Sequence, residues 1–256
     1  MAKTVAIVNQ KGGVGKTTTC VNLAASLTAQ KCRVLVCDFD PQGNATSGFG
    51  VDKSCSPSIY DVIMGNAEIQ KAIVSTRWAD VLPSNKALSG ATVELIGLDR
   101  REYRLKDALN AIKDAYDYIF IDCPPSLELL TLDALCAADT LLVPVQCEYY
   151  ALEGLSDLLY TVRLAKRSLN PALELEGVLL TMYDGRTNLS MQVAEEVKRH
   201  FPGKVFATVI PRNVRLSEAP SHGKPVTAYD SSSRGAVAYR RLAEELLEKN
   251  PLPRRA

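Results

Sequence analysis

A glycine-rich segment with two lysines lies close to the start of the chain. It spans residues 10–17, reads QKGGVGKT, and stands between a short apolar run and a segment with helical spacing. Glycines let the backbone curl so that successive N–H groups point at phosphate oxygens, and the N-terminus of a following helix adds a positive dipole end. Lys16 and Thr17 are the residue types that reach the β- and γ-phosphates and ligate Mg²⁺. The segment therefore predicts a binding site for the phosphates of a nucleotide.

The segment departs from the general phosphate-loop pattern, G-x-x-x-x-G-K-[ST], at its first position. Where that pattern has glycine the chain has Gln10, and a second lysine, Lys11, follows at once. A cation beside the γ-phosphate stabilises the charge of phosphoryl transfer, by roughly 10³–10⁵-fold in rate for the arginine fingers of related reactions. Lys11 is a candidate for the same kind of role. The alternative, a glycine-rich turn that binds no ligand, leaves the second lysine unexplained.

Three aspartates follow two further apolar runs. Asp38 and Asp40 come after the run 33–37, and Asp122 comes after the run 118–121. In an open parallel sheet, ligands bind beyond the carboxyl ends of the strands, so these carboxylates are expected at the edge that holds the phosphates. Asp122 is suited to hold Mg²⁺, directly or through water, and Asp40 to orient or deprotonate an attacking water. Helix capping is the alternative role for each aspartate taken alone.

These residues need a framework of strands and helices, and the chain alternates between the two. Short apolar runs predict strands at residues 4–9, 33–37, 118–121, 141–145, 177–180 and 205–210. Helical spacing is found at residues 17–30, 104–116, 153–168, 190–201 and 235–249. Continuous apolar strands that alternate with helices are typical of a parallel sheet covered on both faces. We therefore expect an α/β fold with a mainly parallel, twisted sheet and helices on both of its faces.

The chain shows no internal division. No linker rich in Pro, Gly and Ser separates two parts, which predicts one domain over residues 1–250 and a short tail at 251–256. Residues 41–100 are the least regular part, so an insertion or mobile loops are expected there. No run approaches the ~20 apolar residues that a membrane-spanning helix needs. The seven cysteines include no C-x-x-C pair, which favours a reducing, cytoplasmic setting.

The charge of the chain is balanced overall but not along its length. The 256 residues include 30 Lys and Arg against 29 Asp and Glu, a net charge of +1. This balance, with 46% hydrophobic residues, excludes a largely disordered chain and a uniformly basic protein that coats nucleic acid by charge alone. Residues 181–256 nevertheless carry 13 basic and 8 acidic groups, a net of +5, against −4 for residues 1–180. One interpretation is a basic binding surface, and the other is a solvated face with clustered charges.

Six motifs make the chain resemble the ParA/Soj family of chromosome and plasmid partitioning ATPases, over nearly its whole length. The motifs are KGGVGKTT (11–18), DFDPQGNAT (38–46), YIFIDCPPSL (118–127), PVQCEYYALEGL (144–155), GVLLTMYDGRTNLS (177–190) and IPRNVRLSEAPSHGKP (210–225). The first and third are shared with MinD-like ATPases, whereas the last three are more specific to the Soj-like branch. The resemblance implies a single-domain P-loop NTPase of the deviant Walker A class, which hydrolyses ATP to ADP and phosphate with Mg²⁺.

The resemblance also assigns roles to the residues that match these motifs. Lys11 matches the signature lysine, which crosses to the ATP of a partner subunit in a nucleotide-sandwich homodimer. Asp40 matches the aspartate that positions the hydrolytic water, and Asp122 matches the Walker B acid. The implied catalytic residues are Lys11, Lys16, Asp40 and Asp122, and the implied metal ligands are Thr17 and Asp122. The residues expected to bind the nucleotide are Lys11, Gly12, Gly13, Val14, Gly15, Lys16, Thr17, Thr18, Pro211 and Asn213, the last two at the adenine end.

The basic C-terminal part resembles the DNA-binding surface of Soj-like proteins, which is independent of sequence and active only in the ATP-bound dimer. The candidate contacts are Arg186, Arg212, Arg215, Lys224, Arg234 and Arg240, and Arg212 is also a candidate for the nucleotide pocket. Few aromatic residues lie among them, so we expect contacts to the backbone of double-stranded DNA rather than stacking on single strands. The resemblance further implies a ParB-type centromere-binding partner that stimulates hydrolysis and releases the DNA. It implies a cytoplasmic, nucleoid-associated protein that does not bind membranes.

Three other activities make different demands on the sequence. A MinD-like ATPase that cycles on membranes, the main alternative, needs a C-terminal amphipathic anchor, whereas residues 242–256 have an acidic face and terminal prolines. An iron protein of the nitrogenase type needs paired cysteines at a dimer axis, and Cys123 and Cys147 do not lie in such motifs. A nucleotide-binding scaffold that does not hydrolyse ATP is disfavoured because both lysines of the loop and the carboxylates expected to act with them are all present.

Overall fold

A mainly parallel sheet forms the centre of the computed structural model, which describes residues 1–126, 128–149 and 151–252. The strands are β1 (Lys3–Ile7), β2 (Val34–Asp38), β3 (Val74–Ser75), β4 (Asp80–Leu82), β5 (Tyr118–Asp122), β6 (Thr140–Gln146) and β7 (Glu174–Thr181). Their order across the sheet is β3-β4-β2-β5-β1-β6-β7, and among these strands only β3 is antiparallel to its neighbour. The predicted sheet type is confirmed. Two motif residues, Leu127 and Tyr150, and residues 253–256 of the predicted tail lie outside the described residues.

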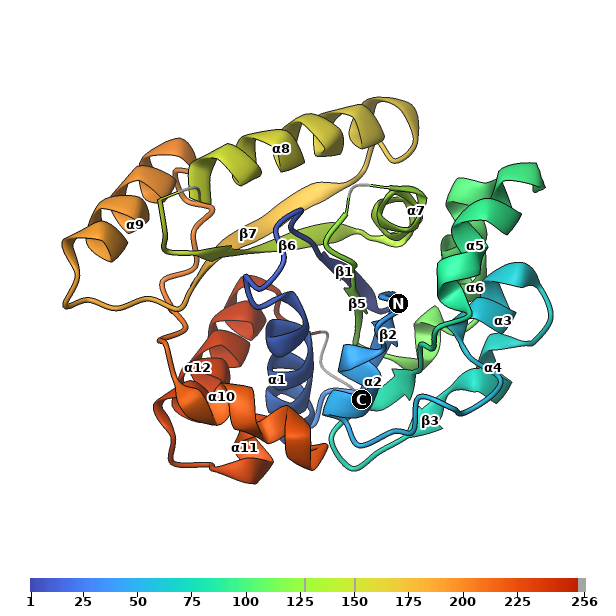
Figure 1. Ribbon diagram of the computed structural model, residues 1–256, viewed down its shortest axis with the longest axis horizontal. Coiled ribbons are helices and arrows are strands. Elements are labelled where there is room, and N and C mark those ends of the chain that lie inside the picture. The colour runs from blue at the N-terminus through green and yellow to red at the C-terminus, as the bar shows by residue number, and fades with distance from the viewer. Residues whose placement is uncertain (127, 150, 253–256) are drawn as a thin grey trace.

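Helices cover both faces of the sheet (Figure 1). One face carries α1 (Lys16–Ala29), α2 (Asn44–Gly48), α10 (Val214–Glu218), α11 (Val226–Tyr229) and α12 (Arg234–Lys249). The other carries α3 (Ile59–Met64), α4 (Ile69–Ala72), α5 (Leu88–Glu94), α6 (Arg104–Asn110), α7 (Leu129–Ala137), α8 (Ala151–Ser168) and α9 (Asn188–His200). Each face has its own cluster of buried apolar side chains, as an α/β sheet with two covered faces requires.

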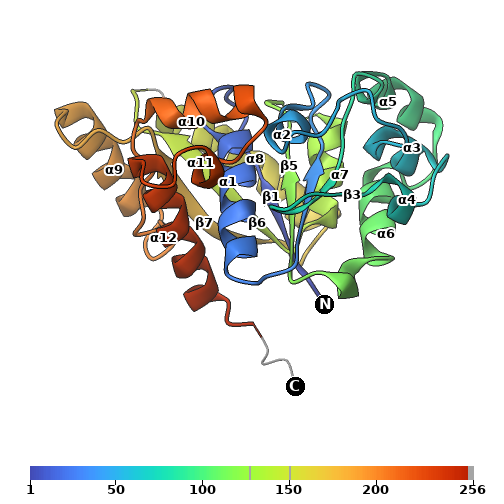
Figure 2. The ribbon, with the colours of Figure 1, turned by 90° about the horizontal axis from the view of Figure 1, so that it is seen from below.

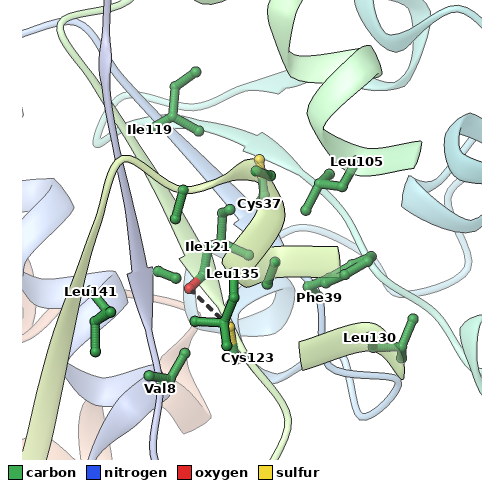
Figure 3. Close-up of a cluster of buried hydrophobic side chains, with 14 of the residues drawn as sticks. Val8, Cys37, Phe39, Leu105, Ile119, Ile121, Cys123, Leu130, Leu135 and Leu141 are labelled. Atoms are coloured by element: carbon green, nitrogen blue, oxygen red, sulfur yellow. Dashed lines mark hydrogen bonds between the residues drawn. The ribbon is translucent and has the colours of Figure 1, made fainter. Parts of the chain in front are cut away.

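Strand β5 shows how the sequence builds both clusters at once. Successive side chains of a strand point to opposite faces. Ile119 and Ile121 lie in the cluster beneath α3 to α9, while Tyr118 and Phe120 lie in the cluster beneath α1 and α12. Figure 3 shows part of the first cluster, with side chains from strands, helices and loops: Val8, Cys37, Phe39, Leu105, Ile119, Ile121, Cys123, Leu130, Leu135 and Leu141. Burying one such aliphatic or aromatic side chain contributes roughly 1.5–3 kcal/mol, so the two faces hold the sheet firmly.

The predicted strand at residues 205–210 is wrong. The segment runs beside β7 and makes one isolated parallel bridge to it, between Val205 and Val178, with Phe206 donating its amide to the Val178 carbonyl at 3.0 Å. The amides of Ala207 and Thr208 donate instead to the carboxylate of Glu245 on α12, at 2.8 and 2.9 Å. A continuous ladder cannot form where these backbone donors are directed to a helix side chain.

Two other predictions from local pattern need correction. The helix predicted over 104–116 ends at Asn110, and a 3₁₀ turn at Lys113–Ala115 follows it. Residues 41–100 are more regular than expected, since they form β3, β4 and the short helices α2 to α5. Helices of four to seven residues are too short to show a helical period in the sequence, and they form because their few apolar side chains pack on the sheet.

Helix α7 carries a buried carboxylate away from the loop residues described above. One oxygen of Asp133 accepts the amide of Leu105 at 3.1 Å, at the start of α6. Its other oxygen is buried and has no hydrogen-bond partner among the described residues. Burial raises the pKa of Asp133 to about 8, and the nearby carboxylates Glu102 and Asp107 act in the same direction.

We expect Asp133→Asn to weaken the pH dependence of stability. The folded pKa lies above the ordinary value of about 3.9, so stability from this group is highest below pH 4 and falls as pH rises toward about 8. Asparagine keeps an acceptor for the Leu105 amide but cannot ionise. In urea unfolding at pH 5.5 and 8.5, the free energy of unfolding of the wild type should fall by about 3 kcal/mol more than that of the variant. Equal losses in both proteins would contradict the assignment.

Candidate active site

The glycine-rich segment leaves the carboxyl end of β1 and leads directly into α1, which begins at Lys16. Gly13 and Gly15 have φ angles of +75° and +93°, in the left-handed region that favours glycine. The residue before the helix, Gly15, provides no side-chain cap. The first amides of α1 therefore keep their donors available for an anion. This is the arrangement that the sequence predicted for a phosphate-binding loop.

The loop is held in place by hydrogen bonds to the two neighbouring strands. The Asn9 side chain donates to the carbonyl of Pro144 on β6 at 2.7 Å and accepts the Lys11 amide at 3.0 Å. At the other end of the loop, the hydroxyl of Thr181 on β7 donates to the carbonyl of Val14 at 2.8 Å. Both contacts use residues far from the loop in sequence, so the sheet fixes the shape of the loop before any ligand binds.

Lys16 is buried beside carboxylates. Its side chain is 7% exposed, and the ammonium donates to the carbonyl of Lys11 at 3.1 Å, across the mouth of the loop. Burial lowers the pKa of Lys16 below its ordinary value, and the nearby carboxylates of Asp122 and Asp40 oppose that shift. A partly dehydrated ammonium at the mouth of the loop is well placed to donate to phosphate oxygens.

Two aspartates lie side by side because β5 runs between β1 and β2. Asp38 at the end of β2 is the register partner of Asp122 at the end of β5. The hydroxyl and the amide of Thr46 both donate to Asp38 at 2.7 Å. Burial still raises the pKa of Asp38 to about 6, although these hydrogen bonds oppose the shift. The pKa of Asp122 is raised further above its usual range, by burial first and then by the charge of Asp38.

Asp122 has the features expected of a metal ligand. Both of its carboxylate oxygens are buried, and neither has a partner at normal hydrogen-bond geometry among the described residues. An unpartnered buried carboxylate is costly, whereas a divalent cation would satisfy it. Thr17 lies close enough for its hydroxyl to lower the pKa of Asp122. A carboxylate and a hydroxyl are the oxygen donors that Mg²⁺ prefers, so the predicted pair fits this ion.

Asp40 stands on a short turn that Asp38 and Thr46 stabilise. Its side chain is 8% exposed, and one of its oxygens accepts the Gln42 amide at 2.9 Å. The hydroxyl of Thr46 also accepts the amide of Ser84 at 2.9 Å, which ties this turn to the loop after β4. Asp38, which the sequence placed at the edge of the sheet without a distinct role, thus orders the turn that carries Asp40.

A cavity of about 530 Å³ opens beside the phosphate loop. Gly15 and Thr18 line it on one side, and Pro211 and Asn213 line it on the other. The structure thus brings the two residues expected at the adenine end next to the loop, although they follow it by about two hundred residues. Other lining residues include Thr181, Met182, Arg212, Val214 and Tyr239, of which sequence reasoning singled out only Arg212.

The second lysine of the loop is held by a carboxylate of the same chain. The ammonium of Lys11 forms an ion pair with Glu148, which follows β6, and both side chains are only partly exposed. Sequence reasoning included Glu148 in a motif but gave it no role. The ammonium of Lys11 is thus engaged by a carboxylate of its own chain.

The basic candidates of the C-terminal part are exposed or partly exposed and lie near α10 to α12. Figure 2 shows α10 and α11 on the same side of the sheet as α1, with α12 beside them. Arg186 and Arg234 line a second cavity, of about 750 Å³, together with Arg241. Sequence reasoning counted Arg241 as basic but did not select it, although its spacing of seven from Arg234 places both on one helix face.

The remaining basic candidates do not share that cavity. Arg212 lines the cavity beside the loop, and Lys224 lines a hollow with Trp78 and His222.

Three of the six basic candidates have partners within the chain: Arg186 pairs with Asp184, Arg215 pairs with Glu218 and Asp230, and Arg240 donates to the carbonyl of Ser231. Phosphate groups would have to compete with these carboxylates for Arg186 and Arg215.

Comparison with known proteins agrees with this geometry. Residues 2–175 match a family model described as an AAA domain. The chain is 59% identical over 96% of its length to "Sporulation initiation inhibitor protein Soj" of Bacillus subtilis, of which it covers 98%. It is 52% identical over 98% of its length to "Chromosome partitioning protein ParA" of Myxococcus xanthus, of which it covers 89%. The chain belongs to the Soj and ParA family.

Solved structures share the fold of this Soj and ParA family member. A crystal structure of cobyrinic acid a,c-diamide synthase from Mycobacterium smegmatis, with a bound ATP analogue and magnesium, is 40% identical to it. The match covers 97% of this chain and 95% of that chain, with a TM-score of 0.85. The P-loop NTPase fold predicted from the sequence is thereby confirmed. No helix in the described ranges is both long enough and apolar enough to pass through a bilayer.

Proposed function

We propose that the chain is a DNA-partitioning ATPase whose ATP-bound dimer binds DNA without sequence specificity and releases it after hydrolysis. The observation that carries the proposal is the meeting of an open helix N-terminus, Lys16 and an unpartnered Asp122 at one edge of the sheet. The identity of about half or more of the residues to proteins named Soj and ParA supports it.

Each part of the loop then has a role in holding ATP. The loop amides and Lys16 bind the β- and γ-phosphates, while Pro211 and Asn213 enclose the adenine end in the 530 Å³ cavity. Thr17 and Asp122 would hold Mg²⁺, which supplies neutralisation of phosphate charge. Asp40 accepts a hydrogen bond from the attacking water and orients it toward the γ-phosphate.

Dimer formation exchanges one partner of Lys11 for another. In the single chain Lys11 is paired with Glu148, so it must exchange this carboxylate for the phosphates of the ATP in the second subunit. A pair between partly exposed side chains is worth only ~0–1 kcal/mol, so a multiply charged phosphate competes well with it. ATP thus joins two subunits, and its hydrolysis removes the charge that held Lys11 across the interface.

The dimer places two basic surfaces on one particle. Each carries Arg186, Arg234 and Arg241 around one cavity, with further basic residues nearby. Neutralising phosphates releases counterions, so doubling the number of neutralised phosphates strengthens binding and makes it steeply dependent on salt. A ParB-type partner would stimulate hydrolysis and so release the DNA, and the protein would be found on the nucleoid in the cytoplasm.

DNA binding measured with ATP, with ADP and without nucleotide tests the proposal. Retention of double-stranded DNA of unrelated sequences should require ATP and Mg²⁺ and should fall steeply between about 50 and 200 mM salt. Equal retention in the three nucleotide states would contradict the proposed switch. Binding to anionic vesicles instead of DNA would favour the MinD-like alternative, although the apolar side chains of α12 (Tyr239, Leu242 and Leu246) are buried rather than available to lipid.

Removing one basic side chain should weaken DNA retention without changing ATP binding. We expect Arg215→Ala and Arg240→Ala each to reduce retention of the ATP form. The slope of log affinity against log salt should become shallower by about 0.9 for each phosphate that the variant no longer neutralises. Arg100→Ala is the matched control, because Arg100 is an exposed, ion-paired arginine beside α6 on the other face of the sheet. A slope that stays at the wild-type value in both variants would remove these residues from the surface.

A further inference from the structure

Two buried polar contacts join α1 to the C-terminal helices. The hydroxyls of Thr19 on α1 and Tyr239 on α12 are 3.1 Å apart and hydrogen-bonded. The side-chain oxygen of Asn22 on α1 accepts the amide of Val226, the first residue of α11, at 2.7 Å. All four residues are buried. Apolar packing alone would let the helices slide, whereas buried hydrogen bonds have a fixed direction and are costly to leave unmade.

On the α1 side, these contacts begin next to the phosphate loop. Thr19 follows the loop residues Thr17 and Thr18 directly. The amide group of Asn22 also donates to the carbonyl of Thr18 at 2.7 Å, so Asn22 links the first turn of α1 to α11. Tyr239 lines the same 530 Å³ cavity as Thr18. Both hydrogen bonds to the C-terminal helices therefore lie within one or two helical turns of the phosphate loop, so a structural change at the start of α1 can reach them.

On the other side, the contacts end on the helices that carry the basic side chains. Tyr239 is buried, while its neighbours on α12, Arg240 and Arg241, lie at the surface. Helix α10 packs tightly against α12, because a Cβ atom on Gly235 would come within 2.7 Å of the Leu216 side chain. The three helices α10, α11 and α12 thus form one packed unit attached to α1.

We infer that Tyr239 and Asn22 are positioning residues that couple the nucleotide bound at α1 to the placement of α10, α11 and α12. Phosphate binding fixes the conformation of the first turn of α1. The two hydrogen bonds then fix the position of the helices that carry the basic surface. The consequence for DNA rests on the proposed function, but the coupling between α1 and these helices does not. The nucleotide site and the basic surface are coupled only if ligands at both sites favour the same placement of these three helices.

Amide hydrogen exchange measures the coupling without DNA. Tyr239→Phe keeps the ring and removes only the hydroxyl, and Tyr118→Phe is the matched control. Tyr118 is also buried, but its hydroxyl donates to the carbonyl of Asn250 at 3.3 Å and not to α1. With a non-hydrolysable ATP analogue and Mg²⁺, exchange in residues 214–249 should slow by about tenfold in the wild type and in Tyr118→Phe. In Tyr239→Phe most of that slowing should disappear.

DNA affinity provides a second measurement with the same three proteins. The ratio of DNA affinities with ATP and with ADP should fall about fivefold to tenfold in Tyr239→Phe, the effect of one buried hydrogen bond. By thermodynamic linkage, the DNA-induced gain in affinity for ATP relative to ADP must fall by the same factor, which a general loss of stability would not produce.

The two measurements separate the inference from the proposed function. Slowing that is equal in all three proteins, or absent from the wild type, would overturn the inference even if DNA is retained. If exchange slows in the wild type but not in Tyr239→Phe, and the wild type retains no DNA, the inference is supported and the proposed function is contradicted.

Discussion

Lys16→Ala is expected to abolish nucleotide binding and, with it, all retention of DNA. Lys16 is the buried cation at the first turn of α1, with its ammonium 3.1 Å from the carbonyl of Lys11. Without it, the phosphates would lie beside the buried carboxylates of Asp122 and Asp38 with less positive charge to balance them. Loss of one charged hydrogen-bonding partner from a buried site costs about 3–5 kcal/mol, a factor of roughly 150 to 4,000 in affinity.

Titration with a fluorescent ATP analogue and DNA retention in the same buffer measure this effect. Removing a buried cation beside carboxylates could also unfold the chain, so circular dichroism must show that the variant remains folded. Lys16→Gln serves as a second variant, because it keeps most of the volume and one donor. Lys86→Ala is the control, since Lys86 is exposed on the loop after β4. DNA retention by a folded Lys16→Ala protein that binds no nucleotide would show that the basic surface is not under nucleotide control.

Asp40→Ala is expected to stop ATP turnover while leaving ATP binding and dimer formation in place. Asp40 lies on the turn after β2, outside the phosphate loop, and one of its oxygens accepts a backbone donor, the Gln42 amide. Its proposed partner is the attacking water. This interaction lowers the energy of the transition state and does not contribute to the affinity for ATP. Loss of a general base or water-orienting group reduces rates by about 10²–10⁴. The ATP-bound dimer should accumulate, and DNA should be retained longer.

Single-turnover hydrolysis and dimer formation by light scattering distinguish binding from chemistry. Asp40→Asn is the closer variant, because its side-chain oxygen can still accept the Gln42 amide, so the turn is kept and only the ionisable group is removed. Asp52→Ala, at an exposed site after α2, is the matched control for removing an acidic side chain. If the Asp40 variants hydrolyse ATP at the wild-type rate, the water-positioning role is wrong. If they fail to bind ATP, Asp40 belongs to the binding site and not to the chemistry.

The elements whose signals are local could be predicted from the sequence. The phosphate loop lies within residues 10–17, and its glycines and following helix were visible because a turn and a helix N-terminus depend on neighbouring residues. The central strands β1, β2, β5 and β6 were found because buried parallel strands are continuous apolar runs. The strand predicted at 205–210 failed for the converse reason, since the amides of Ala207 and Thr208 are directed to Glu245, which lies more than thirty residues away.

Only the tertiary structure decided which of these pieces meet. The sequence placed Asp38 and Asp122 at strand ends, but the order β2-β5-β1 is what makes them register partners beside the loop. It predicted a basic C-terminal part, but not that the hydroxyls of Thr19 and Tyr239 attach that part to the loop helix. Periodicity and spacing report interactions within a few residues along the chain. Contacts across two hundred residues depend on strand order and helix packing, which no local pattern encodes.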